Sequence, residues 1–271
     1  MATRSALAAL ILCLAPLAGA ANPEDAARLA KEGFFALEAR PFHSETLRDA
    51  ARNIDLAART SPDNAWVLVA RSRAMLEAGY MKGDRSRLAS YEADSVRVAG
   101  ELARRALEAG PGEPMAHIQV ARIQIITEDH RGAWDTVNRA HALDPQGFYP
   151  WYYRGVIALR MKDPKRASEA FDAAEARASM PYQKEWAVGR RIDIARQQGD
   201  AAAEERLHKQ LIALKPSEPH PYGNYGIFLK RHKRYDEAIE YFGKALAISP
   251  YRQAEEQLKQ TLLLRDGAKR Q

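Results

Sequence analysis

The chain has 271 residues, of which 46% are hydrophobic and 28% are charged, and its formal net charge is +6 at pH 7. This is ordinary soluble globular composition, with enough apolar residues for a sizeable core. The sole cysteine is Cys13, which excludes cysteine-based zinc sites and, once residues 1–20 are removed, any thiol chemistry. Helix formers are abundant and β-branched residues are scarce, which favours an all-α protein.

Residues 1–20, MATRSALAALILCLAPLAGA, are typical of a secretory signal peptide. A basic start at Arg4 is followed by an apolar stretch over residues 6–17 and by the small-residue cleavage site AGA. The stretch is shorter than the ~20 residues that a spanning helix needs. We therefore expect a periplasmic or secreted protein whose mature chain begins near Ala21. An uncleaved anchor and a lipoprotein are the alternatives.

Prolines that follow an apolar helical stretch recur along the rest of the chain. They are Pro62, Pro111, Pro145, Pro181, Pro216 and Pro250, and successive differences between these numbers are 49, 34, 36, 35 and 34. A period of this length is typical of proteins in which each repeat is one supersecondary unit that stacks on its neighbours.

Small and aromatic residues recur at matching places within these repeats. In the first helix, a ring-bearing residue precedes a small residue by four positions: Trp66 and Ala70, His117 and Ala121, Trp151 and Gly155, Tyr222 and Gly226. In the second helix the matching residues are Ala99, Ala103 and Ala106; Ala133, Val137 and Ala140; Ala167, Phe171 and Ala174; Ala238, Phe242 and Ala245. We expect the small residues to let paired helices approach closely. Phe242 would then fill the space against the next repeat, and Pro250 would end the second helix.

This pattern resembles the tetratricopeptide repeat family, most closely between Tyr222 and Pro250. The resemblance implies a right-handed superhelical solenoid of about six antiparallel helix pairs over residues 21–250, and a capping helix within residues 251–271. The repeat that ends at Pro216 departs from the pattern. There Ile192 takes the glycine slot and Glu204 takes an alanine slot.

The 49-residue step contains an excess that keeps helical spacing. We expect residues 88–110 to form one long helix, paired with a helix that runs from about Asn64 to Tyr80 or Met81. The pair would protrude by roughly 10 Å at 1.5 Å per residue. Its tip residues are Tyr80, Met81 and Tyr91, and the neighbouring repeat also has a long turn, which contains Phe42. Either these aromatic residues pack on one another, or they form a partner-binding or dimerising knob.

No catalytic, phosphate-binding or metal-binding motif stands out in the chain. His117 occupies a ring slot of the repeat, so we expect it to pack in the core. The cluster KRHKR at residues 230–234 is expected in a turn, where it either faces solvent or meets an anionic surface. We predict no enzyme activity, no cofactor and no metal site.

The family resemblance also implies a site, because first helices of such repeats line a concave face on which peptides bind. The residues that we assign to this face are Arg71, Gln119, Arg122, Tyr152, Arg160, Arg190, Asn224 and Lys230. Arginines accompanied by a tyrosine suit carboxylates and extended peptides. Simple solvation of each arginine is the alternative.

We therefore predict an exported scaffold or assembly factor of the bacterial cell envelope that binds proteins through extended or acidic segments. The positive charge is spread along the chain, which favours solvated helix faces over nucleic-acid binding. No transmembrane helix is expected in the mature chain. Alternatives are a subunit of one envelope machine, a binding module for anionic lipid or cell-wall glycan, and an envelope hydrolase.

Overall fold

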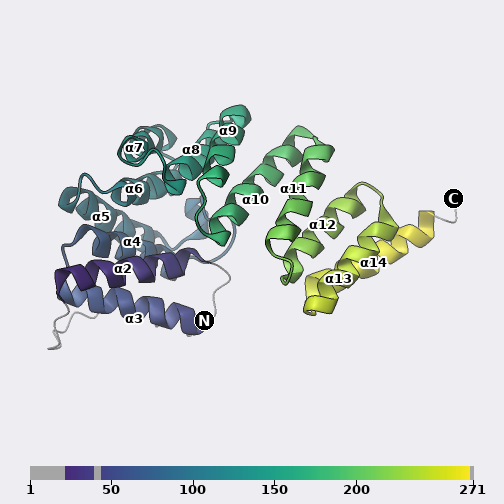
Figure 1. The fold of residues 1–271 in the computed structure, drawn as a ribbon, viewed down its shortest axis with the longest axis horizontal. Helices are drawn as coiled ribbons and strands as arrows, with labels where there is room; N and C mark the ends of the chain where they lie inside the picture. The colour runs from purple at the N-terminus through teal and green to yellow at the C-terminus, as the bar shows by residue number, and fades with distance from the viewer. Residues whose placement is uncertain (1–21, 40–43, 269–271) are drawn as a thin grey trace. The chain divides into compact units, whose positions relative to one another are not determined.

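A computed structural model describes residues 22–39 and 44–268. Over these ranges the chain forms the α-helices α2 to α14 and the short 3-10 helix η1, with no β-strand (Figure 1). The predicted all-α fold is therefore confirmed, whereas the right-handed superhelical path stays a prediction. The expected signal peptide and the turn that contains Phe42 lie outside the described residues.

The chain divides into two compact units, residues 1–182 and 183–271, with the boundary near the start of α10 (Pro181–Gln198). Unit 1 contains α2 (Pro23–Glu38), α3 (Ser44–Thr60), α4 (Ala65–Gly79), η1 (Leu88–Ser90), α5 (Ala93–Ala109), α6 (Pro114–Ile126), α7 (His130–Leu143), α8 (Phe148–Arg160) and α9 (Pro164–Ala176). Unit 2 contains most of α10 and then α11 (Ala201–Leu214), α12 (Pro219–Arg231), α13 (Tyr235–Ile248) and α14 (Arg252–Ala268).

Helices pack as successive pairs within each unit. In unit 1, α2 packs on α3, α4 on α5, α6 on α7 and α8 on α9 (Figure 1). The first helices of these pairs also contact one another in series, from α2 through α4 and α6 to α8. In unit 2, α12 packs on α13, and the C-terminal helix α14 packs on α13.

The turns inside four helix pairs, from α6–α7 to α12–α13, repeat the same backbone chemistry. One residue there has a positive φ: Glu128 at 65°, Lys162 at 60°, Gly199 at 72° and Lys233 at 60°. In three of these turns an aspartate caps the second helix, accepting a 2.9 Å hydrogen bond from a backbone N–H: Asp129 from Gly132, Asp163 from Arg166 and Asp200 from Ala203. The left-handed residue ends one helix and the aspartate begins the next.

The ring-bearing slot of the first helix has a specific hydrogen bond. A ring nitrogen or hydroxyl meets the carbonyl oxygen of the proline six residues earlier: His117 with Pro111 at 2.9 Å, Trp151 with Pro145 at 3.0 Å and Tyr222 with Pro216 at 3.0 Å. Trp66 instead donates from Nε1 to Glu113 at 2.8 Å. The ring therefore ties the start of three first helices to the turn before them, which explains why tryptophan, histidine and tyrosine alternate at this slot.

The small residues are where the paired helices come closest. A Cβ placed on Gly226 would lie 2.7 Å from Cε1 of Phe242, and one on Gly155 would lie 2.7 Å from Cε1 of Phe171. Both phenylalanines are fully buried. The ring of Phe242 covers the glycine of its own repeat, and the expectation that it fills the space against the next repeat stays a prediction. The glycine is needed because that ring occupies the volume of a side chain.

In the repeat with the extra residues, the first helix ends about where it was expected to, but the second helix is shorter than the one expected over residues 88–110. Helix α4 ends at Gly79 and α5 begins at Ala93, so the extra residues form a folded connection. Tyr80 and Tyr91 lie side by side in an isolated antiparallel bridge, with ring centroids 5.6 Å apart. Gly79 lies at a close approach of α4 and α5, since a Cβ on Gly79 would lie 2.2 Å from that of Ser95. The expected helical tip was therefore wrong. Tyr80 and Tyr91 pack on each other as the alternative expected, Phe42 lies outside the described residues, and a partner-binding or dimerising knob stays a prediction.

Candidate functional site

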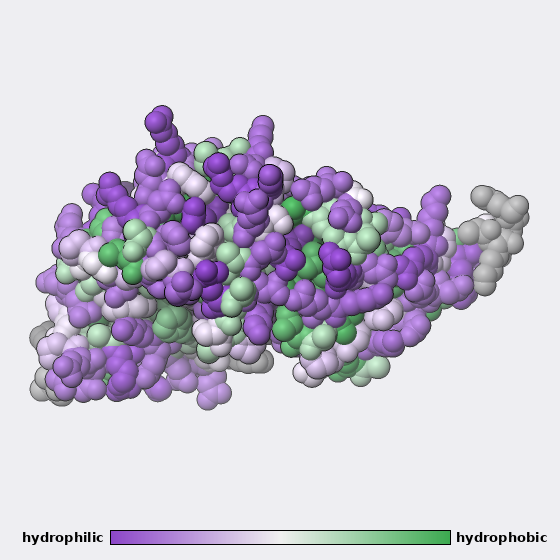
Figure 2. Space-filling view, turned by 45° about the horizontal axis from the view of Figure 1, so that its top comes forward, coloured by the Kyte–Doolittle hydropathy of each residue, from purple (hydrophilic) through white to green (hydrophobic). Residues whose placement is uncertain are grey.

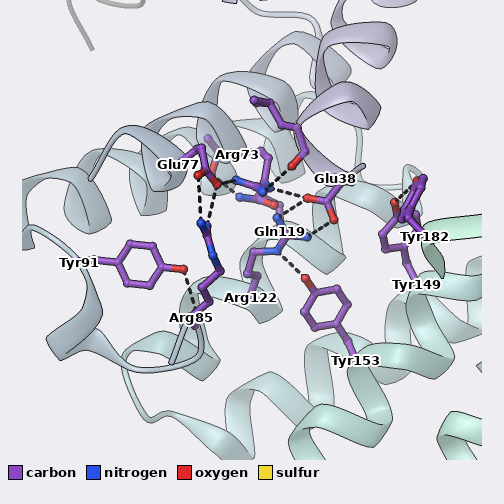
Figure 3. A network of polar contacts seen from close by, with 12 residues as sticks. Glu38, Arg73, Glu77, Arg85, Tyr91, Gln119, Arg122, Tyr149, Tyr153 and Tyr182 are labelled. Atoms are coloured by element: carbon purple, nitrogen blue, oxygen red, sulfur yellow. Dashed lines mark hydrogen bonds and ion pairs between the residues drawn. The ribbon is translucent and has the colours of Figure 1, made fainter. Parts of the chain in front are cut away.

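A network of buried polar side chains joins the first helices of unit 1 (Figure 3). At its centre is Glu38, the last residue of α2, whose side chain is 1% exposed. Around it lie Arg73 of α4, Arg122 of α6 and Tyr153 of α8. We call these four residues the Glu38 network. Each comes from a different first helix, so the network spans all four repeats of the unit.

Glu38 accepts hydrogen bonds from two arginines. Arg73 donates from Nε to Oε1 at 2.5 Å, and Arg122 donates from Nη1 and Nη2 to the two carboxylate oxygens at 3.0 and 3.1 Å. Arg122 also donates from Nε to the Tyr153 hydroxyl at 2.6 Å. A guanidinium that contacts both oxygens of one carboxylate is held in a fixed plane. The network therefore fixes the relative positions of α2, α6 and α8.

The charges in this network stabilise one another strongly. Burial opposes ionisation of Glu38, but the charges and hydrogen bonds of Arg122 and Arg73 outweigh it and lower the pKa of Glu38 to about 2. Burial raises the pKa of the Tyr153 hydroxyl, so this group stays protonated at neutral pH. Glu38 is thus a fixed carboxylate rather than a group that exchanges protons near pH 7.

A second carboxylate extends the network towards the folded connection between α4 and α5. Glu77 accepts from Nη1 of Arg73 at 3.1 Å and from both terminal nitrogens of Arg85 at 2.7 and 3.1 Å. Arg85 belongs to that connection, which also reaches α8 through Asp84 and Arg160, 2.6 Å apart. The extra residues of this repeat therefore attach to two first helices.

Two predicted groove residues belong to this interior rather than to an open surface. Gln119 is fully buried and donates from Nε2 to Oγ of Ser72 at 3.0 Å. Tyr152 is 8% exposed and packs on the ring of Phe171. Arg122 and Arg160 form ion pairs with Glu38 and Asp84, each of which also pairs with a second arginine.

Arg71 was expected to match Arg122 in the neighbouring repeat, and this register was wrong. Arg73 is the true counterpart, because Arg73 and Arg122 donate to the same carboxylate. Burial and the charge of Arg105 lower the pKa of Arg71, whose carboxylate neighbours are Asp55 and Asp63. Counted from the preceding proline, the slots filled by His117 and Ala121 correspond to Leu68 and Ser72, two residues beyond Trp66 and Ala70. Matching Trp66 instead of Leu68 to His117 had shifted the expected register of this repeat by two residues.

The other predicted groove residues lie in unit 2. Asn224 on α12 is exposed, and Arg190 on α10 lies 3.7 Å from Asp193. Lys230 donates from Nζ to Gln257 at 2.5 Å and to Gln260 at 3.2 Å, both on α14. The terminal helix therefore occupies the amine of Lys230. Asn224 remains an exposed polar side chain on a first helix.

Unit 2 has a polar cluster of its own at the irregular repeat. Glu204, 2% exposed, accepts hydrogen bonds from Arg196 at 2.9 Å and from Arg231, and its Oε1 lies 3.6 Å from Nε2 of His208. Burial lowers the pKa of Glu204's neighbour His208 to about 4, although the charge of Glu204 opposes this shift. The carboxylate in the alanine slot thus takes its partners from α10, α11 and α12.

The sequence had not pointed to Glu38, Arg73 or Tyr153. Arg73 would have been found by aligning first helices from their prolines instead of from Trp66. Glu38 is the last residue of α2 and has no repeat signature. Its partner Arg122 lies 84 positions away, a separation at which local spacing gives no information.

Neither polar cluster has the form of a reactive centre, since each carboxylate is held by arginines. Among the described residues, no group of three or more histidine, aspartate or glutamate side chains is placed to hold a metal ion. None of the described helices is long and apolar enough to cross a membrane. On the face shown in Figure 2, hydrophilic side chains dominate and hydrophobic ones form small groups.

The family described as tetratricopeptide repeat matches residues 219–252. Among curated proteins, no sequence matches the chain. A solved structure of the APC/C hetero-tetramer Cut9–Hcn1 is similar, with a TM-score of 0.63 and 16% identity over 89% of this chain and 43% of the other. Yeast Tom70 gives 0.56 and 17% over 91% and 50%, and Pseudomonas aeruginosa PilF gives 0.55 and 13% over 88% and 98%.

This chain spans less than half of the matched Cut9–Hcn1 chain and half of Tom70. At these identities the similarity shows the fold. The matched repeat, residues 219–252, covers α12 and α13, the helix pair in which Gly226 lies beneath Phe242.

Proposed function

Since the chain is a tetratricopeptide-repeat protein, we propose that it is a non-catalytic scaffold or assembly factor that binds another protein on its first-helix face. The observation on which this proposal rests is the Glu38 network. It holds α2, α4, α6 and α8 in fixed relative positions, and a surface that is ordered before binding loses less entropy when a partner binds.

We further propose that the partner supplies an extended segment with acidic side chains. Five arginines and three carboxylates meet on this part of unit 1: Arg73, Arg85, Arg87, Arg122 and Arg160, with Glu38, Glu77 and Asp84. Arginines therefore outnumber carboxylates by two in this set. Among the buried and half-buried pairs of this set, Asp84 and Arg160 are the most accessible, with side chains 41% and 22% exposed. A partner carboxylate that binds Arg160 therefore competes only with a partly solvated ion pair.

The place of action that we propose is the bacterial cell envelope, with export directed by residues 1–20. This rests on the sequence of that segment, its basic start, apolar stretch and small-residue cleavage site. N-terminal sequencing of the protein from its native host tests it. A mature start at Ala21 or Asn22 supports export, whereas retention of Met1 or a lipid on Cys13 contradicts it.

Photo-crosslinking in the native cell tests the binding face. A photoreactive amino acid would replace Arg160 on α8 or Asn224 on α12, with control positions at Arg104 on α5 and Lys244 on α13. The two test positions lie on first helices and the two control positions lie on second helices, so the comparison separates the two faces. We expect one adduct of defined mass from the first-helix positions alone. Equal adducts from the control positions would contradict the assignment of the face.

A further inference from the structure

Unit 1 has a second cluster of cationic side chains, away from the Glu38 network, on α7, α8, α9 and the residue that follows α9. It alternates arginine with tryptophan: Arg166, Trp134, Arg154, Trp151 and Arg177. We call these five residues the arginine–tryptophan cluster. Its members come from two successive repeats, and none of them belongs to the predicted groove set. Trp151 was assigned a structural role in the repeat.

The guanidinium groups lie over the indole rings at cation–π distance. Arg154 is central, with its Cζ 5.5 Å from the ring centroid of Trp134 and 4.8 Å from that of Trp151. Arg166 lies 5.2 Å from Trp134, and Arg177 lies 4.9 Å from Trp151. Arg177 is further held by a 2.9 Å hydrogen bond from Nη1 to the carbonyl of Ala173. The rings hold the three guanidinium groups in place, so they need little ordering when a ligand binds.

Carboxylates do not balance these charges within the described part of the chain. The sole ion pair of the cluster there joins Arg166 to Asp163 at 3.5 Å, and both side chains are exposed. Burial, followed by the like charge of Arg166, lowers the pKa of Arg154. In the Glu38 network, by contrast, each buried arginine contacts a carboxylate. The arginine–tryptophan cluster therefore has unused capacity for anions.

We propose that the arginine–tryptophan cluster is a second binding surface, which takes a carboxylate-rich segment of a partner protein. Guanidinium groups stacked on rings still present their N–H edges, and these match the two oxygens of a carboxylate. Arginine and tryptophan are also the residues most enriched among those that dominate the energy of protein interfaces.

A peptide fits this surface better than an anionic membrane does. Membrane-surface binding gains from aromatic rings that insert among lipid headgroups. Here Trp134 and Trp151 are half-buried and lie against guanidinium groups. Three arginines fixed at separate places along two helices instead suit a segment with several acidic side chains in sequence.

The test is direct binding of a fluorescein-labelled oligoglutamate peptide to the full mature chain at low salt, measured by fluorescence anisotropy. We expect binding that weakens as salt rises, and none of the matching oligoglutamine peptide. Arg154→Gln should weaken oligoglutamate binding by roughly fivefold to tenfold, since it removes one charge-assisted contact. Arg139→Gln is the matched control, because Arg139 is an exposed arginine on α7 outside the cluster. It should change binding by less than about twofold.

Arg166→Gln provides a second variant at a more exposed place, so the result does not depend on the folding of Arg154→Gln. Circular dichroism melts confirm that each variant is folded. Equal binding by the wild type and both cluster variants would overturn the proposal. So would binding to phosphatidylglycerol vesicles without any binding of oligoglutamate, because the surface would then be a membrane contact. Neither result bears on the first-helix face, whose crosslinking test uses other residues.

Discussion

Arg122 on α6 donates two hydrogen bonds to Glu38 on α2, at 3.0 and 3.1 Å, across 84 positions of sequence. The carboxylate is 1% exposed and the guanidinium 12% exposed, so this pair is made almost entirely away from water. The ion pair specifies the register of α2 and α6, because the bidentate geometry is met at one relative placement.

Replacing Glu38 tests how much unit 1 depends on this pair. Glu38→Gln leaves the buried Arg73 and Arg122 without a counter-charge, and removing one partner of a buried pair costs about 3–5 kcal/mol. Urea unfolding followed by circular dichroism measures the loss. Glu32→Gln is the control, since Glu32 lies on the same helix in an exposed pair with Arg28. Equal midpoints for the two variants would show that the Glu38 network adds nothing to stability.

The lowered pKa of Glu38 predicts that the free energy of unfolding depends on pH under acidic conditions. Its pKa is about 2 in the folded protein and near 4.5 when unfolded, so its contribution is complete above about pH 4.5. The contribution should fall as the pH drops from there towards 2, because the unfolded state binds the proton first. The difference in unfolding free energy between wild type and Glu38→Gln should therefore shrink across this window. A constant difference would contradict the lowered pKa.

The lowered pKa of His208 predicts a second, higher pH range in which unit 2 loses stability. Burial lowers its pKa to about 4 from an ordinary value of 6.5, so the folded protein holds it neutral above pH 4. The stabilising effect is complete above pH 6.5 and is lost as the pH falls towards 4, because the unfolded state gains a proton that the folded state does not. In thermal melts between pH 7 and pH 4, His208→Leu should lose less stability than the wild type. Parallel losses would exclude His208 as the cause.

Two glycines of the best-matched repeat separate close packing from helix propensity. Gly226→Ala places a Cβ 2.7 Å from the Phe242 ring, which we expect to destabilise the protein by about 1–3 kcal/mol. Gly243→Ala, on α13, meets nothing within 4 Å and should stabilise by up to about 1 kcal/mol. Denaturant unfolding measures both. Effects of the same sign would show that the glycine at 226 is not required by Phe242.

The connection between α4 and α5 is expected to loosen when its contact with α8 is removed. Asp84→Asn removes the charge that pairs with Arg160, a pair in which Ser86 also donates to the aspartate at 2.6 Å. Hydrogen exchange should speed up over residues 80–92 while the melting temperature changes little, because the core lies elsewhere. Asp94→Asn is the control, at a side chain that is 94% exposed. Unchanged exchange in Asp84→Asn would show that the tyrosine pair alone holds the connection.

Features that depend on neighbours along one helix or one turn were predictable from the sequence. The buried set Ala133, Val137 and Ala140, like Ala238, Phe242 and Ala245, lies where its spacing placed it, and every one of these residues is fully buried. Helical periodicity fixes which side chains share a face, and a proline or a left-handed residue fixes where a helix ends. Both kinds of information are local, so they are present in a short stretch of chain.

Features that depend on which helices meet were decided by the tertiary structure alone. The spacing of residues 88–110 is helical, yet α5 begins at Ala93, and the residues before it form a connection held by ion pairs to α4 and α8. Arg71 and Arg73 both lie on α4, but the one that reaches Glu38 is Arg73, because α2 and α6 lie on that side. The sequence by itself determined the repeats, their buried small residues and their turns. The tertiary structure decided how charges are paired, because ion pairs form between side chains that packing brings together from distant parts of the chain.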